Sequence, residues 1–220
     1  MEIWRQPYLH RVILRSENEG AKFSTFKRKC LFLDRDGVVI KERNYISEPL
    51  QVELEKGAIE LMQRATEEGY IVVIVTNQSG IERRYFGWGN YEAVTWRMLE
   101  LIDNDKLIAG IYANGYKDNN YYRKPQPGMI KWAAINLSID NSKSIIIGDK
   151  YSDVMAGYEA GVSKLCHILT GHGRDEIFKY KLCNKNSRDS GQRWMSLKDQ
   201  DINVRIFNDL IEAKLAHGLF

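Results

Sequence analysis

Apolar and polar positions alternate along the chain in two different rhythms from residue 30 onward. Continuous apolar runs predict strands at 30–34, 70–75, 108–112, 144–147 and 162–169. The run 70–75 is dominated by β-branched residues, which is typical of a strand covered on both faces. These runs therefore indicate a buried sheet.

Stretches with apolar residues on one side predict helices at 57–68, 90–103, 127–136, 151–160 and 203–217. Asn90 is the expected N-cap of the second of these helices, and Pro127 suits the first turn of the third. Gly161 is expected to end the fourth helix. Most of the predicted helices therefore have a recognisable start or stop signal.

Strands that alternate with helices predict an α/β fold, in which a Rossmann-like parallel sheet is flanked by helices and joined by right-handed crossovers. In such sheets ligands bind outside the carboxyl ends of the strands. We therefore look for chemistry in the residues that directly follow the apolar runs.

The two ends of the chain are harder to interpret. Residues 1–29 are expected to form an N-terminal extension that packs on or leads into a single domain at 30–220. Within the extension, residues 12–14 suit an edge strand or a docking segment. The segment 174–201 is polar, and its pattern predicts no particular element.

Composition suits a soluble globular protein, and the charge fits an anionic ligand. Of the 220 residues, 44% are hydrophobic and 28% are charged, and no apolar run approaches the ~20 residues that cross a bilayer. The N-terminus has no signal-peptide pattern, so we expect a cytoplasmic protein without a membrane partner. The net charge of +3 fits an anionic substrate and does not require nucleic acid.

Cysteine and histidine usage argues against structural bridges or a thiolate metal site. The three cysteines, Cys30, Cys166 and Cys183, are odd in number and show no CxxC spacing. The four histidines are scattered, and each is expected to be structural or solvated.

Two polar clusters follow the first two predicted strands. Asp34 and Asp36 are separated by one residue, and Gly37 permits the turn that would aim both carboxylates at one cation. The segment 76–80 offers a hydroxyl, an amide and free backbone N–H groups, which suit phosphoryl oxygens. Each cluster alone also fits a plain junction or turn.

Two further clusters follow later in the chain. Arg123 and Lys124 precede a helix start, where the helix dipole favours an anion. The same two residues also fit an ordinary basic loop. Asp149, with Asp153 nearby, follows the strand 144–147 and suits an oxygen site for Mg²⁺, although Asp149 or Ser152 is also a fitting helix N-cap. All four clusters occur in order, each in the loops that the fold turns toward ligands.

The segments FLDRDGVV, VTNQSGI, RKPQPGM and IGDKYSDVMAGYEAGV, in this order, resemble the haloacid dehalogenase (HAD) superfamily of phosphotransferases. The chain is most similar to the small capless members that act on heptose bisphosphate or histidinol phosphate. The motifs cover about residues 30–173, which is most of the chain. The resemblance implies a capless HAD-like fold.

The resemblance also implies roles for single residues. Asp34 matches the nucleophile and Asp36 the general acid/base, while Thr76 matches the hydrogen-bond donor to the phosphoryl group and Lys124 the charge-neutralising cation. The implied Mg²⁺ ligands are Asp34, Asp149 and the backbone carbonyl of Asp36. The implied substrate-binding residues are Asn77, Arg83, Arg123 and Lys150.

From the resemblance we expect a Mg²⁺-dependent phosphatase that works through an aspartyl-phosphate. Its expected substrate is a small phosphorylated sugar, best matched by the 7-phosphate of D-glycero-D-manno-heptose 1,7-bisphosphate. Histidinol-phosphate phosphatase and nucleic-acid 3′-phosphatase are the alternatives within the class. A catalytically silent binding protein is the alternative outside it, although such a protein would usually have lost Asp34 or Asp36. We expect a monomer.

The chain departs from the family pattern at two places. Many relatives carry a zinc loop before the RKP motif, but residues 112–122 contain neither Cys nor His, so we expect no zinc. Tyr116, Tyr121 and Tyr122 are expected to pack where that metal would lie. Arg84 stands where the family favours Gly, and the preceding Arg83 reaches either a second phosphate or solvent.

Overall fold

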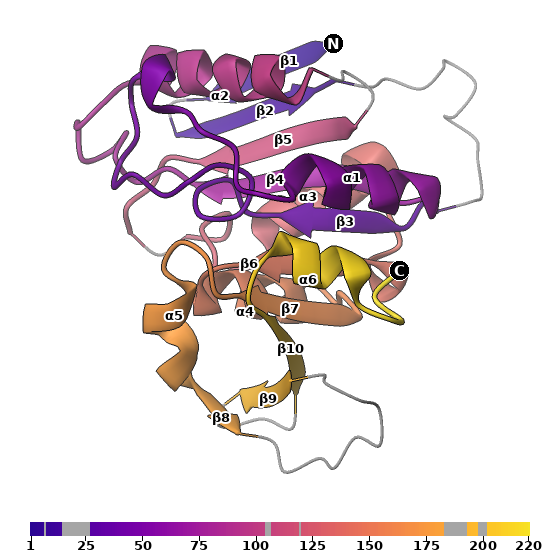
Figure 1. Cartoon of the computed structure of the whole chain (residues 1–220). Coiled ribbons are helices and arrows are strands. Elements are labelled where there is room, and N and C mark those ends of the chain that lie inside the picture. Colours follow the sequence, from indigo (N-terminus) through magenta and orange to yellow (C-terminus); the bar gives the residue numbers. More distant parts are fainter. Residues whose placement is uncertain (7, 15–26, 104–106, 119, 183–192, 198–201) are drawn as a thin grey trace.

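The computed structural model describes the chain apart from residues 7, 15–26, 104–106, 119, 183–192 and 198–201. A ten-stranded sheet runs through the whole molecule in the order β1-β2-β5-β4-β3-β6-β7-β10-β9-β8 (Figure 1). The strands are β1 (Glu2–Gln6), β2 (Leu9–Ile13), β3 (Cys30–Leu33), β4 (Ile71–Asn77), β5 (Ile108–Asn114), β6 (Ile145–Gly148), β7 (Lys164–Ile168), β8 (Tyr180–Leu182), β9 (Arg193–Leu197) and β10 (Asn203–Phe207).

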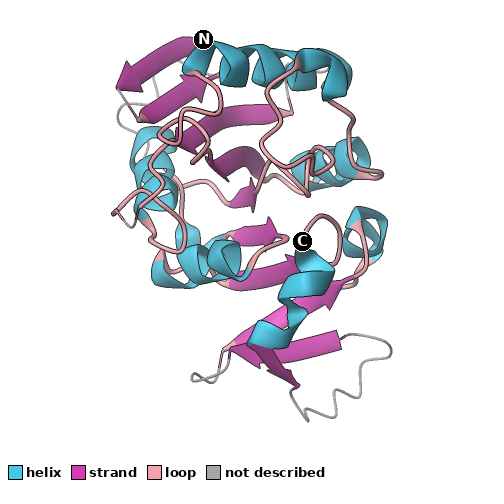
Figure 2. Ribbon diagram, turned by 90° about the vertical axis from the view of Figure 1, so that its left-hand side faces the viewer, coloured by secondary structure: helices cyan, strands magenta, loops and turns pink. Residues whose placement is uncertain are grey.

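Helices cover both faces of this sheet. They are α1 (Ala58–Glu67), α2 (Trp88–Ile102), α3 (Gly128–Leu137), α4 (Tyr151–Glu159), α5 (Gly173–Glu176) and α6 (Leu210–Leu215). Figure 2, turned by 90°, shows the sheet between the helical layers. From β5 to β10 the six neighbouring strands are parallel, and the pairs at both edges are antiparallel. The prediction of a flanked parallel sheet is therefore confirmed.

Alternation along the central strand explains the two layers. Leu31 and Leu33 join the core that faces α1, α2 and α6, whereas Cys30 and Phe32 join the core that faces α3 and α4. All four side chains are fully buried. A strand whose successive side chains point to opposite faces needs apolar residues throughout when both faces are covered, as the sequence of β3 has.

The order of the strands indicates where on the sheet a ligand binds. From β3 the chain moves outward on one side to β4 and β5, and then returns to the other side of β3 with β6. Strand order thus reverses between β3 and β6, and ligands bind at such a switch point, beyond the carboxyl ends of the strands.

The helix starts differ in detail from those expected. α2 begins two residues before Asn90, whose Oδ1 accepts a hydrogen bond from Gly87 N–H at 3.2 Å; Asn90 therefore caps from the first turn and not from the N-cap position. α4 has Lys150 as its N-cap, and the Asp153 side chain accepts from Lys150 N–H at 2.9 Å. Neither Asp149 nor Ser152 is that cap.

The prediction of one helix over 203–217 is wrong. Residues 203–207 form β10, which pairs in parallel with β7, and α6 starts only at Leu210. The apolar positions Val204, Ile206 and Phe207 also suit a strand, and pairing with the sheet decided between the two patterns. Asp209 caps α6 by accepting a hydrogen bond from Glu212 N–H at 2.8 Å, so Asn208-Asp209 was the overlooked break.

The polar segment 174–201 contributes β8 and β9, which extend the sheet beyond β10 where the structure describes it. At the opposite edge, residues 2–13 form a hairpin of β1 and β2, and β2 pairs antiparallel with β5. Residues 12 and 13 belong to a strand, as one of the two possibilities had it, but β1 and not β2 is the edge strand, and Leu14 lies just beyond the end of β2. Within the described part of the chain, no helix is both long enough and apolar enough to span a membrane.

Candidate active site

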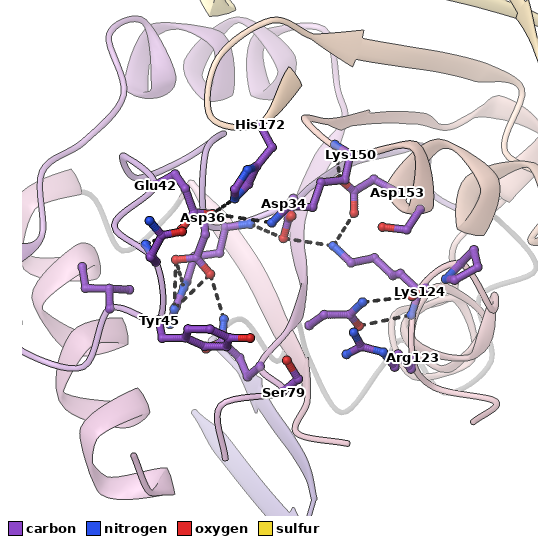
Figure 3. Close-up of a pocket in the computed structure, with 17 residues that line it drawn as sticks. Asp34, Asp36, Glu42, Tyr45, Ser79, Arg123, Lys124, Lys150, Asp153 and His172 are labelled. Carbon is purple, nitrogen blue, oxygen red and sulfur yellow. Dashed lines mark hydrogen bonds and ion pairs between the residues drawn. The ribbon is translucent and has the colours of Figure 1, made fainter. Parts of the chain in front are cut away.

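A cavity of about 540 Å³ opens at the carboxyl ends of β3, β4 and β6, and Figure 3 shows the side chains around it. Asp34 directly follows β3, and its N–H donates to the Ile147 carbonyl of β6 at 3.2 Å. Asp34 therefore sits at the switch point of the sheet. Asp36, Asn77, Arg123, Lys124 and Lys150 also line the cavity.

We define the floor as four buried charged residues: Asp34, Lys124 and Asp153, which line the cavity, and Asp149, whose carboxylate lies beside those of Asp34 and Asp153. Lys124 Nζ lies 2.9 Å from Asp34 Oδ1 and 2.6 Å from Asp153 Oδ1, and it donates to the Val75 carbonyl at 2.8 Å. The Lys124 and Asp153 side chains are only 2% and 1% exposed. Burial alone would lower the pKa of Lys124, but attraction to Asp153 and Asp34 raises it.

The floor has more negative than positive charge. Asp34, Asp149 and Asp153 each offer a carboxylate oxygen, and these atoms lie within 4.8 Å of one another. Burial, followed by repulsion from Asp34 and Asp153, raises the pKa of Asp149 well above its usual value. Burial is also the main cause that raises the pKa of Asp153.

One carboxylate oxygen of Asp149 lacks a hydrogen-bond partner among the described residues. Asp149 Oδ2 accepts a hydrogen bond from His172 N–H at 2.8 Å, but Oδ1 is buried without a hydrogen-bond partner among the described residues. A hard divalent cation prefers such oxygen ligands and relieves the repulsion between the carboxylates. The donor set therefore fits Mg²⁺.

Gly37 was predicted to permit the turn after Asp34, and the structure shows that a side chain would also not fit at this position. Gly37 has φ +82°, and a Cβ on it would lie 2.4 Å from Asp149 Oδ2. A Cβ on Gly171, in the loop after β7, would lie about as close to the same oxygen. The absence of two side chains thus lets three loops meet over the floor.

Asp36 lies beside the floor and is held by a network of its own. Its carboxylate accepts hydrogen bonds from Arg35 and, at 2.8 Å, from Gln78 Nε2. Gln78 Nε2 also donates to Thr76 Oγ1 at 2.9 Å. Arg35 is fully buried, with its guanidinium over the Tyr91 ring at 5.1 Å. Thr76 is buried behind Gln78, while Asp36 and Gln78 border the cavity.

The last residue of β4 fixes the basic segment across the cavity. Asn77 Nδ2 donates to the Lys124 carbonyl at 3.0 Å, and its Oδ1 accepts from Lys124 N–H at 3.1 Å. One amide side chain thus holds the backbone of Lys124 at both polar atoms. Asn77 therefore aligns the lysine with Asp34.

More exposed residues form the rim of the cavity, defined as Glu42, Tyr45, Arg123, Lys150 and His172 (Figure 3). Glu42 Oε2 lies 3.5 Å from Lys150 Nζ and 3.2 Å from His172 Nε2. The Lys150 and His172 side chains are 35% and 38% exposed. The rim thus surrounds the opening with two cations, a histidine, a carboxylate and an aromatic ring.

Some candidate residues lie apart from the cavity, and others were missed. Arg83 is exposed and does not line the cavity, although its charge adds to burial in lowering the pKa of Arg123. Asp153, expected only near the oxygen site for Mg²⁺, both caps the start of α4 and joins the floor. His172 follows a strand, so the strand-end rule would have found it. No local pattern marks Glu42 or Tyr45.

The loop that lacks Cys and His is held by aromatic and amide contacts. The Tyr116 and Tyr8 rings pack with their centroids 4.9 Å apart, and Tyr122 packs edge-on against Trp132 at 5.7 Å. The Tyr121 and Tyr122 rings also touch edge-on at 5.4 Å. All three predicted tyrosines therefore take part in ring packing at this loop.

The sequence is similar to known phosphatases. Residues 29–169 match the family described as polynucleotide kinase 3 phosphatase. A D-glycero-alpha-D-manno-heptose-1,7-bisphosphate 7-phosphatase of Photorhabdus laumondii is 36% identical over 73% of this chain and 93% of its own length. A D-glycero-beta-D-manno-heptose-1,7-bisphosphate 7-phosphatase of Mesorhizobium japonicum is 38% identical over 61% of this chain and 67% of its own length.

Solved structures agree in fold. A HAD-like phosphatase from Mesorhizobium loti superimposes with a TM-score of 0.74 at 27% identity, covering 95% of this chain and 91% of its own. D,D-heptose 1,7-bisphosphate phosphatase from B. bronchiseptica, complexed with magnesium and phosphate, has a TM-score of 0.69 at 25% identity, covering 84% and 96%.

Fold, acidic floor and similarity together define the class of the protein as a phosphatase, a hydrolase of phosphate monoesters. The chain belongs to the haloacid dehalogenase superfamily, in the family described as polynucleotide kinase 3 phosphatase.

Proposed function

We propose that this phosphatase removes the 7-phosphate of D-glycero-D-manno-heptose 1,7-bisphosphate, with Asp34 as nucleophile and Mg²⁺ as cofactor. The observation that carries the proposal is the floor, in which a buried lysine and three carboxylates converge where strand order reverses. The substrate is supported by relatives at 36% and 38% identity that are named for this reaction.

Asp34 is suited to attack phosphorus because its orientation is fixed. Its Oδ1 accepts hydrogen bonds from Arg35 N–H at 2.7 Å and from Lys124 Nζ at 2.9 Å. The attack forms an aspartyl-phosphate and releases the sugar oxygen. Lys124, whose pKa is raised, stays protonated and offsets the negative charge on the phosphoryl oxygens.

Asp36 is the proposed general acid and base. It lies two residues after Asp34 and borders the cavity, and Gln78 and Arg35 orient its carboxylate. It would donate a proton to the leaving sugar oxygen and then take one from the water that hydrolyses the intermediate.

Asp34, Asp149 and the backbone carbonyl of Asp36 are the proposed ligands of Mg²⁺, with Asp153 close by. When bound, the ion supplies positive charge that lets an anionic carboxylate approach an anionic phosphate. Asp149 Oδ1, which is buried without a partner among the described residues, is the ligand atom that most requires it.

The rim is the proposed recognition site for the rest of the substrate. Arg123 and Lys150 border the cavity from opposite loops, and both are cations suited to a second phosphate or to sugar hydroxyls. A cavity of about 540 Å³ is of the size that encloses a small metabolite. Arg83 is exposed outside it and would meet only a substrate that extends beyond the rim.

The test is phosphate release with Mg²⁺ across a panel of substrates. The panel contains both anomers of heptose 1,7-bisphosphate, histidinol phosphate, other sugar monophosphates, a 3′-phosphorylated oligonucleotide and an aryl phosphate. We expect kcat/KM for one heptose anomer to exceed that for every other compound by about 100-fold or more, because only that anomer would place its second phosphate and its hydroxyls on the rim together.

Equal and slow turnover of all compounds would leave the phosphatase class intact and remove the heptose assignment. Preference for histidinol phosphate or for the oligonucleotide would replace that assignment with the corresponding alternative.

A further inference from the structure

Arg123 is held on the rim by a carbonyl from another part of its own loop. Its Nη1 donates to the Tyr116 carbonyl at 2.9 Å, and the same oxygen accepts from Asn114 Nδ2 at 3.2 Å. The Arg123 N–H donates to Asn120 Oδ1 at 3.0 Å, which anchors the base of the side chain. The direction of the guanidinium therefore depends on where the Tyr116 carbonyl lies.

The position of Tyr116 is set by the N-terminal hairpin. The Tyr116 ring packs on the Tyr8 ring at 4.9 Å, and Gly115 N–H donates to the Tyr8 carbonyl at 2.7 Å. Tyr8 lies in the turn between β1 and β2. It also packs against the small buried cluster that includes Ile81 and Phe86, next to the loop that follows β4.

Sheet topology brings this turn to the active-site edge. In the antiparallel pair of β2 and β5, Leu9 is opposite Asn114, the last residue of β5. The turn that precedes Leu9 therefore lies beyond the carboxyl end of β5, on the same side as the cavity. The hairpin is thus placed to contact the loop that carries Arg123.

We infer that the N-terminal hairpin, through Tyr8, positions Arg123 for the part of the substrate that lies away from the transferred phosphate. Tyr8 does not line the cavity, so it is a positioning residue and acts through Tyr116. The inference rests on the proposed role of Arg123 in substrate binding. It gives residues 2–13 a part in substrate specificity in addition to extending the sheet.

The test is a double-mutant cycle of Tyr8→Ala and Arg123→Ala, with KM and kcat measured on the panel compound that the unaltered enzyme prefers. We expect Tyr8→Ala alone to raise KM about 5- to 20-fold while kcat changes less than about 3-fold, because binding away from the reacting atoms is weakened. In the Arg123→Ala background the same substitution should change KM less than about 2-fold. KM for an aryl phosphate should stay the same for Tyr8→Ala.

Two controls separate positioning from general destabilisation. Tyr8→Phe keeps the ring and should behave like the unaltered enzyme. Trp4→Ala removes another ring from the same hairpin, one that packs on Trp132 at 4.9 Å and not on Tyr116. It should lower the melting temperature about as much as Tyr8→Ala and leave KM unchanged.

An equal rise of KM in both backgrounds, or an equal rise with Trp4→Ala, would overturn the inference. Because the cycle uses whichever compound the enzyme prefers, it decides the role of Tyr8 even when the panel rejects the heptose substrate. Conversely, a heptose preference combined with an unchanged KM for Arg123→Ala would reject the positioning role and keep the proposed function.

Discussion

The floor and the rim of one cavity are built in opposite ways. Floor side chains are at most 7% exposed, and Lys124 Nζ lies 2.9 Å from Asp34 and 2.6 Å from Asp153. Rim side chains are up to 47% exposed, and the ion pairs of Glu42 with His172 and Lys150 are 3.2 and 3.5 Å long. Buried charges interact strongly because water is excluded, whereas exposed pairs are screened. In the proposed function, phosphoryl transfer takes place at the floor and substrate choice depends on the rim.

The largest effect is expected where the floor meets phosphorus. Asp34→Asn should reduce kcat by about 10⁴-fold or more, because an amide cannot form the aspartyl-phosphate. Phosphate release under saturating substrate measures this effect. Asp175→Asn, an exposed carboxylate that lies outside the cavity, is the matched control and should keep full activity. Steady turnover by Asp34→Asn would remove Asp34 as the nucleophile.

Removal of metal should have the next largest effect. Treatment with EDTA should stop phosphate release, and added Mg²⁺ should restore it, because the carboxylates of the floor otherwise repel both one another and the substrate. Elemental analysis of the purified protein should find no stoichiometric zinc, since residues 112–122 contain no Cys or His. Activity that survives thorough chelation, or one zinc per chain, would contradict this prediction.

The floor should also be electrostatically unfavourable without metal. Asp149→Asn should raise the free energy of unfolding of metal-free protein at pH 7.5 by about 1–3 kcal/mol, because an ionised carboxylate is then no longer buried without a partner for Oδ1. Denaturant unfolding in EDTA measures this difference, with Asp175→Asn as the control. Equal stability of the two proteins would argue against strain in the floor.

The pH dependence of that difference has a defined sign. The pKa of Asp149 is raised in the folded state, so the folded protein binds this proton more tightly than the unfolded chain, where the pKa is about 3.9. Lowering the pH should therefore stabilise the unaltered protein relative to Asp149→Asn and shrink the gap. A gap that widens on acidification would contradict the assignment.

The smallest effect is expected at the rim. Lys150→Met should raise KM for the preferred substrate about 10-fold and change kcat less than about 3-fold, because an exposed cation contributes to binding more than to bond breaking. Steady-state kinetics on the preferred and the aryl phosphate substrates measure both values. A fall in kcat of about 100-fold with unchanged KM would mean that Lys150 takes part in phosphoryl transfer, and it would contradict the separation of roles between floor and rim.

Backbone conformation adds a second contrast between the two regions. Asn44, Tyr45 and Arg84 have φ of +48°, +63° and +61°, a conformation that side chains other than glycine adopt at a cost. Tyr45 borders the cavity, and its ring meets that of Tyr85, the neighbour of Arg84, at 4.9 Å. A left-handed conformation at residue 84 suits glycine, the residue expected there from the family resemblance.

Local signals were sufficient for the parts of the fold that depend on neighbouring residues. The segments that form β3, β4 and β6 are apolar because both faces of those strands are covered. The polar residues that follow them mark where the strands end. The positions of Asp34, Lys124 and Asp149 around one cavity could therefore be anticipated from chain order alone.

Tertiary structure decided what depends on partners distant in sequence. Residues 203–207 satisfy both a helical and a strand pattern, and only the free edge of β7 made them a strand. Asp153 gained its second role because Lys124 approaches within 2.6 Å from another loop. Glu42 reached Lys150 and His172 in the same way.

The sequence by itself determined the order of the central strands and helices along the chain and the candidate residues for phosphoryl transfer, because apolar patterning and residue chemistry are properties of short segments. The tertiary structure decided which charges became buried neighbours and which residues came together at the rim. It also decided that Tyr8 of the N-terminal hairpin packs against the loop that carries Arg123. Those contacts join segments about a hundred residues apart, and no local pattern specifies which distant surface a side chain will meet.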